Sequence, residues 1–141
     1  KTHGEATGAV GSSKEERRRS MIVGTIPKER SEIILVDDVL TTGAAKYDSI
    51  NDLTELLDDP KFTGLFIAVD RQEVGVDGKS AVESFTSTTG IPVFSVVNSA
   101  EILNYLREQG RVANSILNRM ESYLRVYGTP EEGAWIRRIS R

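Results

Sequence analysis

The sequence predicts an α/β domain with a parallel sheet, and two observations support that fold class. Apolar runs at 33–36, 62–69 and 91–97 have the length of buried strands. Each run is followed by a stretch in which apolar residues recur at helical spacing. Such alternation of strand and helix favours parallel strands joined by right-handed crossovers. The length of 141 residues fits one domain.

The strands and the first helix are predicted from local signals. Residues 31–39 are expected to form the central strand, buried on both faces, and a short strand is expected at 21–24. An amphipathic helix follows between Ala44 and Asp59, where Asp58, Asp59 and Pro60 end it. The last strand covers 91–97, with Pro92 near its beginning.

Three further helices follow from capping and periodicity. A short helix over 80–89 ends at Gly90. Asn98 and Ser99 cap the next helix, with Glu101 in its first turn. Its expected buried face comprises Ile102, Leu103, Tyr105 and Leu106. After Gly110 another amphipathic run uses Val112, Ala113, Ile116, Leu117, Met120, Leu124 and Tyr127, which we expect to serve core and subunit packing.

Composition narrows the class of protein. Hydrophobic residues make up 38% and charged residues 28%, as in globular proteins. A net charge of −3 gives no electrostatic reason to expect nucleic acid or an anionic membrane. The absence of cysteine and the single histidine exclude disulfides, thiolate zinc sites and multi-histidine sites within one chain. No apolar run reaches membrane-spanning length and no signal peptide is visible, so we expect a cytoplasmic location.

The stretch with the clearest chemical meaning is residues 33–45, IILVDDVLTTGAA. Two carboxylates, Asp37 and Asp38, end an apolar strand, and a small hydroxyl-rich turn precedes a helix. The backbone N–H groups of such a turn can bind a phosphate. Because carboxylates repel phosphate, they should face sugar hydroxyls or a metal on the same ligand. The alternative is an ordinary strand–helix turn with an aspartate near the N-cap.

This motif resembles the signature of the type I phosphoribosyltransferases, which use phosphoribosyl pyrophosphate. The resemblance implies a three-layer, Rossmann-like parallel sheet flanked by helices. It also implies that Asp37 and Asp38 act in catalysis by holding the ribose, while the loop from Thr41 to Ala45 binds the 5-phosphate. The implied substrate-binding segment continues from the carboxylates through Val39, Leu40, Thr41, Thr42, Gly43, Ala44 and Ala45.

The first five residues, KTHGE, resemble a loop of orotate phosphoribosyltransferases. The resemblance implies that residues 1–20 are a flexible catalytic loop that closes over the active site, commonly of the neighbouring subunit in a homodimer. Lys1 and His3 would then bind the pyrophosphate and act in catalysis. Composition alone predicts a disordered tail here. The charge run at 14–19 either lengthens this loop or is simply solvated.

A second charged segment, Asp70-Arg71-Gln72-Glu73, follows the strand at 62–69. Ligands of open α/β sheets bind at this carboxyl edge. The segment resembles one in orotate phosphoribosyltransferases whose arginine contacts orotate, and this implies that Arg71, together with Thr41, holds the orotate. A guanidinium binds a carboxylate through two hydrogen bonds. The alternative is a surface ion pair between Asp70 and Arg71.

The resemblance covers residues 1–128, but only the carboxyl-terminal part of that family's domain. It implies a partial phosphoribosyltransferase core at 21–128, which lacks the family's amino-terminal portion and is inactive alone. Residues 129–141 form a tail, for which a docking segment or a vector-like extension would fit. Whether residues precede Lys1 in the natural chain stays open.

The implied reaction belongs to pyrimidine biosynthesis. Orotate and phosphoribosyl pyrophosphate give orotidine 5′-phosphate and pyrophosphate, with Mg²⁺ arriving on the sugar donor and no direct protein ligand for the metal. Two other classes fit parts of the sequence. One is a non-catalytic protein of the same fold that binds a nucleotide or phosphoribosyl pyrophosphate. The other is a phosphoacceptor receiver domain, against which the Thr41-Thr42-Gly43 turn argues.

Overall fold

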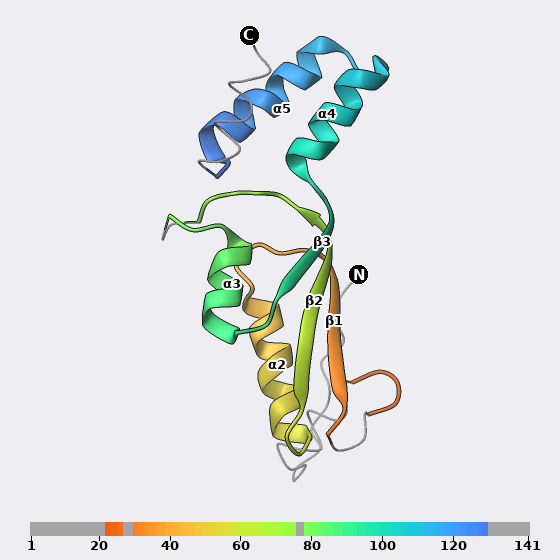
Figure 1. The fold of residues 1–141 in the computed structure, drawn as a ribbon, viewed down its shortest axis with the longest axis vertical. Helices are drawn as coiled ribbons and strands as arrows, with labels where there is room; N and C mark the ends of the chain where they lie inside the picture. The colour runs from red at the N-terminus through yellow and green to blue at the C-terminus, as the bar shows by residue number, and fades with distance from the viewer. Residues whose placement is uncertain (1–21, 27–29, 76–77, 130–141) are drawn as a thin grey trace, which may run out of the picture. The chain divides into compact units, whose positions relative to one another are not determined.

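The computed structural model describes residues 22–26, 30–75 and 78–129 of the chain (Figure 1). Strands and helices alternate from β1 to α4, as the sequence predicts. No described helix is long and apolar enough to cross a membrane. The elements are β1 (Glu32–Val39), α2 (Ala44–Leu56), β2 (Lys61–Asp70), α3 (Ala81–Thr89), β3 (Val93–Asn98), α4 (Ser99–Gln109) and α5 (Asn114–Tyr127).

Contacts divide the chain into two compact units. The larger unit begins with residues 32–44 and resumes at residue 62, so it holds the body of the sheet, α3, α4 and α5. The smaller unit contains residues 45–61, which include nearly all of α2, and the segment that ends at Ser31.

The sheet has three strands in the order β1-β2-β3. Strands β2 and β3 are parallel, with Leu65 opposite Val93 and Asp70 opposite Asn98. The hydroxyl of Thr63 donates to the carbonyl of Ile33 at 3.2 Å and links β2 to β1. Because the strands are parallel, their carboxyl ends lie at the same edge of the sheet. A crossover that contains a helix joins each strand to the next, as the alternating pattern predicts.

Strand β1 differs from the prediction in its place and its burial. It lies at one edge of the described sheet, whereas β2 is central. Its residues alternate between exposed and half-buried, and Ile34 and Val36 are 57% and 77% exposed. The prediction of a central strand buried on both faces is therefore wrong, because the described residues leave one face of β1 open.

The ends of α3 and α4 follow the predicted capping signals. Ser80 and Asn98 each form a capping box with the glutamate three residues later, Glu83 and Glu101. Gly90 and Gly110 end these helices in the left-handed conformation, with φ of 72° and 63°. The cap of α4 matters for function because Asn98 also ends β3, so the helix starts at the carboxyl edge of the sheet.

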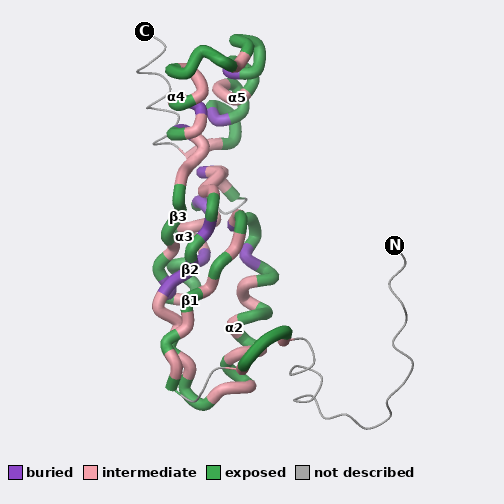
Figure 2. The backbone as a smooth tube through the Cα atoms, turned by 90° about the vertical axis from the view of Figure 1, so that its right-hand side faces the viewer, coloured by how far each residue is buried: buried purple, intermediate pink, exposed green. Residues whose placement is uncertain are grey.

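The α4–α5 helical hairpin has its own hydrophobic core. Leu103, Leu117 and Leu124 are buried, and Leu106, Val112 and Met120 pack against them. Figure 2 shows buried segments, in purple, on both helices of the hairpin. The prediction that Tyr105 belongs to the buried face is wrong, since Tyr105 is 61% exposed. Ile116 and Tyr127, at 49% and 54% exposed, also lie outside the core.

Two further predictions about element boundaries are wrong. Residues 22–24 form no strand, and Val23 is fully exposed. Helix α2 ends at Leu56 rather than near Asp59, which adopts a left-handed φ of 52°. No residue of α2 is buried, so the predicted apolar side of the helix is at most half-buried.

Candidate active site at the carboxyl edge of the sheet

The two predicted carboxylates lie within the last residues of β1. The backbone N–H of Asp38 donates to Asp37 Oδ1 at 2.8 Å, and that of Val39 donates to Asp38 Oδ1 at 2.7 Å. Asp37 is half-buried whereas Asp38 is exposed, in step with the strand's alternation. Because successive side chains of a strand point to opposite faces, the two carboxylates occupy different environments.

The loop after β1 turns sharply at Gly43. Gly43 is buried and has φ of 76°, a conformation that favours glycine. The N–H of Ala44, the first residue of α2, donates to Thr42 Oγ1 at 3.5 Å, the outer limit of a hydrogen bond. The loop thus exposes Thr41 and Thr42 and leads directly into a helix N-terminus, the local structure that suits a phosphate.

A cavity of about 540 Å³ lies between the segments that follow β1 and β2. It brings Leu40, Thr41 and Thr42 together with Arg71, four of the residues that the sequence singled out. Asp37, Asp38, Val39, Gly43, Ala44 and Ala45 are not among its lining residues. Its lining comprises Leu40, Thr41, Thr42, Asp70, Arg71, Gln72, Glu73, Val74, Gly75, Lys79, Ala81 and Ser84.

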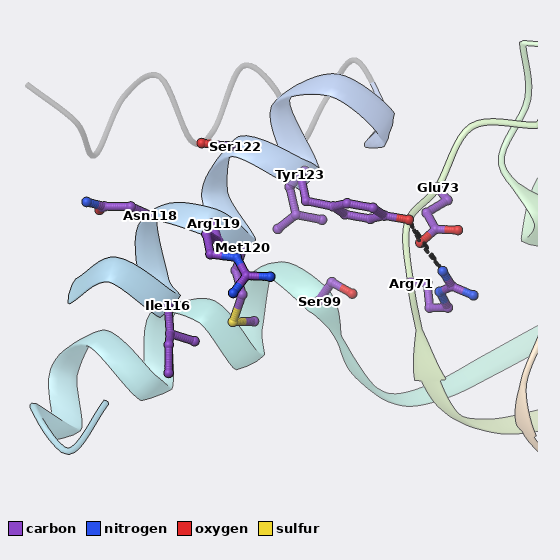
Figure 3. A pocket seen from close by; sticks show the side chains of 10 residues that line it. Arg71, Glu73, Ser99, Ile116, Asn118, Arg119, Met120, Ser122 and Tyr123 are labelled. Atoms are coloured by element: carbon purple, nitrogen blue, oxygen red, sulfur yellow. Dashed lines mark hydrogen bonds and ion pairs between the residues drawn. The ribbon is translucent and has the colours of Figure 1, made fainter. Parts of the chain in front are cut away.

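Arg71 also borders a second cleft, of about 900 Å³, which runs along α5 (Figure 3). Here its Nη2 lies 2.5 Å from Glu73 Oε1 and 3.4 Å from the hydroxyl of Tyr123. That hydroxyl in turn donates to Glu73 Oε1 at 2.7 Å. Figure 3 shows the Tyr123 ring reaching from α5 toward this pair. Arg71 therefore stands where the two cavities adjoin.

The network changes the acid–base properties of two of its members. Burial disfavours the charged guanidinium, but the hydrogen bond and the charge of Glu73 outweigh it and raise the pKa of Arg71. The hydrogen bond to Glu73 also raises the pKa of Tyr123, because a carboxylate acceptor favours the neutral phenol. At neutral pH the network thus has a cationic Arg71 and a protonated Tyr123.

Gln72 fixes the backbone beside Arg71. It is 9% exposed and has a left-handed φ of 56°. Its N–H donates to Asp70 Oδ1 at 2.8 Å, and its Oε1 accepts from the N–H of Ala100 at 3.0 Å. The N–H of Thr129 donates to the Gln72 carbonyl at 2.9 Å. Non-glycine residues with positive φ often lie at functional sites.

The structure tests some site predictions and leaves others open. Lys1 and His3 lie outside the described residues. The alternative surface pair of Asp70 with Arg71 is wrong, because Arg71 pairs with Glu73 and Asp70 accepts from the Gln72 backbone. The sequence reasoning missed Tyr123, since no local signal links it to a segment 50 residues earlier.

The described residues offer no cluster of three or more metal-ligating side chains. Mg²⁺ commonly binds through one or two carboxylates and the oxygens of a substrate phosphate. Asp37 and Asp38 are carboxylates of that kind, and they lie just before the loop that is predicted to bind a phosphate. The donor set therefore fits a magnesium ion that is carried by a phosphorylated substrate.

Comparison with known sequences relates the chain to one group of enzymes. No model of a protein family matches it. It is 40% identical over 100 residues to the orotate phosphoribosyltransferase of Methylococcus capsulatus, covering 71% of this chain and 45% of the relative. It is 33% identical over 132 residues to that of Dichelobacter nodosus, covering 93% of this chain and 52% of the relative. The chain thus spans about half the length of the curated relatives it matches.

Comparison with solved structures gives the same result. The crystal structure of orotate phosphoribosyltransferase from Francisella tularensis matches with a TM-score of 0.57 and 31% identity. The match covers 70% of this chain and 47% of that structure. UMP synthase of Leishmania donovani shares the fold alone, at 18% identity and a TM-score of 0.57. In sequence and in fold, the chain is therefore related to about half of an orotate phosphoribosyltransferase.

Proposed function

We propose that this chain forms part of an orotate phosphoribosyltransferase, which transfers the phosphoribosyl group of phosphoribosyl pyrophosphate to orotate. Its products are orotidine 5′-phosphate and pyrophosphate. The observation that carries the proposal is the cavity that joins Thr41 and Thr42 to Arg71. The relatedness to curated enzymes of that name, across most of this chain, supports it.

The sugar half of the reaction is assigned to β1 and its loop. Positive charge develops on the ribose as pyrophosphate leaves, so nearby carboxylates favour the transition state. Asp37 and Asp38 hold the ribose hydroxyls from unequal positions, since Asp38 is exposed and Asp37 is half-buried. The loop from Thr41 to Ala45 fixes the 5-phosphate through backbone N–H groups and the helix N-terminus.

The base half is assigned to Arg71 and Thr41. Orotate is a planar pyrimidine that carries a carboxylate, and a guanidinium binds that group through two parallel hydrogen bonds. Both residues line the same cavity, and Arg71 stays cationic at neutral pH. The shared lining of Thr41, Thr42 and Arg71 supports binding of the base next to the loop that holds the sugar phosphate.

The leaving group completes the proposal. Lys1 and His3 bind the pyrophosphate, and the loop at 1–20 serves the neighbouring subunit of a homodimer. Mg²⁺ supplies charge neutralisation on the pyrophosphate oxygens. Exclusion of water by the closed loop protects the sugar donor from hydrolysis. A metabolic enzyme of this kind acts in the cytoplasm.

The test is an assay of the protein at its natural length, which intact mass establishes. Orotate absorbance is followed with phosphoribosyl pyrophosphate and Mg²⁺. We expect Asp38→Asn to abolish most turnover and leave the chain folded, whereas Asp59→Asn, the same change at an exposed loop position, retains it. Unchanged turnover in Asp38→Asn removes the assignment. The 141-residue piece alone should show no turnover.

The alternative is a non-catalytic protein of the same fold. In it, the cavity lined by Thr41, Thr42 and Arg71 binds a ligand without completing the reaction. Binding of phosphoribosyl pyrophosphate by the natural-length protein, without formation of orotidine 5′-phosphate, would select this alternative.

A further inference from the structure

We infer that Tyr123 is a positioning residue, which holds Arg71, through Glu73, in the orientation that binds a substrate carboxylate. Helix α5 then belongs to the base-recognition site although it follows the sheet in the chain. This inference rests on the proposed function, because it takes orotate as the ligand of Arg71. It adds a residue that the sequence motifs do not contain.

The first support is the shared contact atom. The Tyr123 hydroxyl donates to Glu73 Oε1, the oxygen that also pairs with Arg71. Glu73 alone would compete with a substrate carboxylate for the guanidinium. A phenol that donates to the same oxygen takes up part of its negative charge and weakens that competition.

The second support is that only one nitrogen of the Arg71 guanidinium contacts Glu73 and Tyr123. Both contacts of Arg71 with Glu73 and Tyr123 go through Nη2. Among the described residues, this leaves the N–H groups of Nη1 and Nε to donate to a ligand. These groups point in different directions, so a carboxylate uses one of them, alone or beside the second N–H of Nη2.

The third support is a backbone connection between the same two segments. The N–H of Val74 donates to the Tyr127 carbonyl at 2.8 Å, and Thr129 donates to Gln72 at 2.9 Å. The end of α5 is therefore bound to the segment that carries Arg71 and Glu73. The position of the Tyr123 ring relative to Arg71 is thereby set by main-chain contacts on either side of Glu73.

The experiment measures binding of two probes, orotate and phosphoribosyl pyrophosphate, to the natural-length protein by ligand-observed NMR titration. Tyr123→Phe removes only the hydroxyl. We expect it to weaken orotate binding about three- to tenfold, the net effect of one lost hydrogen bond of ordinary strength. Binding of phosphoribosyl pyrophosphate should not change, because that ligand uses the loop after β1.

The matched control is Tyr127→Phe. Its ring lies 4.8 Å from that of Tyr123 on the same helix, and no described residue hydrogen-bonds to its hydroxyl. We expect it to bind both probes as the unmodified chain does. A melting temperature for each variant separates a loss of fold from a loss of binding.

Three outcomes would contradict these statements, and they are distinguishable. No binding of orotate by the unmodified chain contradicts the proposed function itself. Orotate binding that is equal in the unmodified chain and in Tyr123→Phe overturns the positioning role alone. An equal loss of both probes in Tyr123→Phe also overturns it, because it indicates a general structural role.

Discussion

The side-chain oxygen of Gln72 accepts a hydrogen bond from the backbone N–H of Ala100 at 3.0 Å. This contact joins the segment after β2 to the first turn of α4, where a helix N–H lacks a partner within the helix. Ala100 is buried, so water does not readily replace Gln72. The residue next to Arg71 is thereby anchored to a second element of the same edge.

Replacing Gln72 with alanine should destabilise the fold. The change leaves the buried N–H of Ala100 without its acceptor, which costs about 1–3 kcal/mol of the free energy of unfolding. Urea denaturation measures this. Gln109→Ala, at an exposed position of α4, is the control and should stay within about 0.5 kcal/mol. Equal effects of the two changes would contradict the anchoring role.

The Tyr123–Glu73 contact predicts a titration shift. Glu73→Gln removes the negative charge that favours the neutral phenol, so the pKa of Tyr123 should fall toward its ordinary value. Since the folded pKa is raised, the contact stabilises the fold below about pH 10 and is lost as pH rises through the raised value. NMR of ¹³C-labelled tyrosine measures the pKa. Glu108→Gln, at an exposed position of α4, should leave it unchanged.

The left-handed turn at Gly43 predicts a cost for any side chain there. Gly43→Ala should lower the free energy of unfolding by at least about 1–2 kcal/mol, the cost of holding an L-amino acid in the left-handed conformation. Gly78 has nearly the same φ, 77° against 76°, but open space around it. Gly78→Ala therefore measures the backbone cost alone. Only Gly43→Ala should also weaken binding of phosphoribosyl pyrophosphate, and equal binding in both variants would contradict the assigned loop.

The strands expose apolar side chains that proteins normally cover. Val36 and Val96 are 77% and 83% exposed, and Phe66 stacks on Phe94 with ring centroids 5.0 Å apart. Val36→Lys and Val96→Lys should change the free energy of unfolding by less than about 0.5 kcal/mol each. They should also reduce binding of a hydrophobic dye. A large loss of stability would show that these positions are buried in solution.

Local sequence signals were enough to predict the helix ends and strands that depend on interactions between residues close in the sequence. Ser80 and Asn98 cap their helices through side chains within three residues, and Gly90 and Gly110 end those helices by their own conformational freedom. The strand at 62–69 and the position of Arg71 after it also followed from the apolar pattern. These features need no knowledge of distant residues.

Features set by distant residues could not be predicted. The burial of β1 depends on whether other parts of the fold cover Ile34 and Val36. The apolar sequence of the strand is the same in either case, so it does not predict the burial. Tyr123 lies 50 residues from Glu73, so only the folded chain brings them together. The different exposure of Asp37 and Asp38 likewise follows from where β1 ends, which the motif does not specify.

The most direct test of the account is a crystal structure of the chain with phosphoribosyl pyrophosphate and Mg²⁺. We expect the 5-phosphate to lie against the backbone of Thr41–Ala45 and the ribose hydroxyls to lie within hydrogen-bond distance of Asp37 or Asp38. A sugar donor bound elsewhere, with this loop empty, would contradict it.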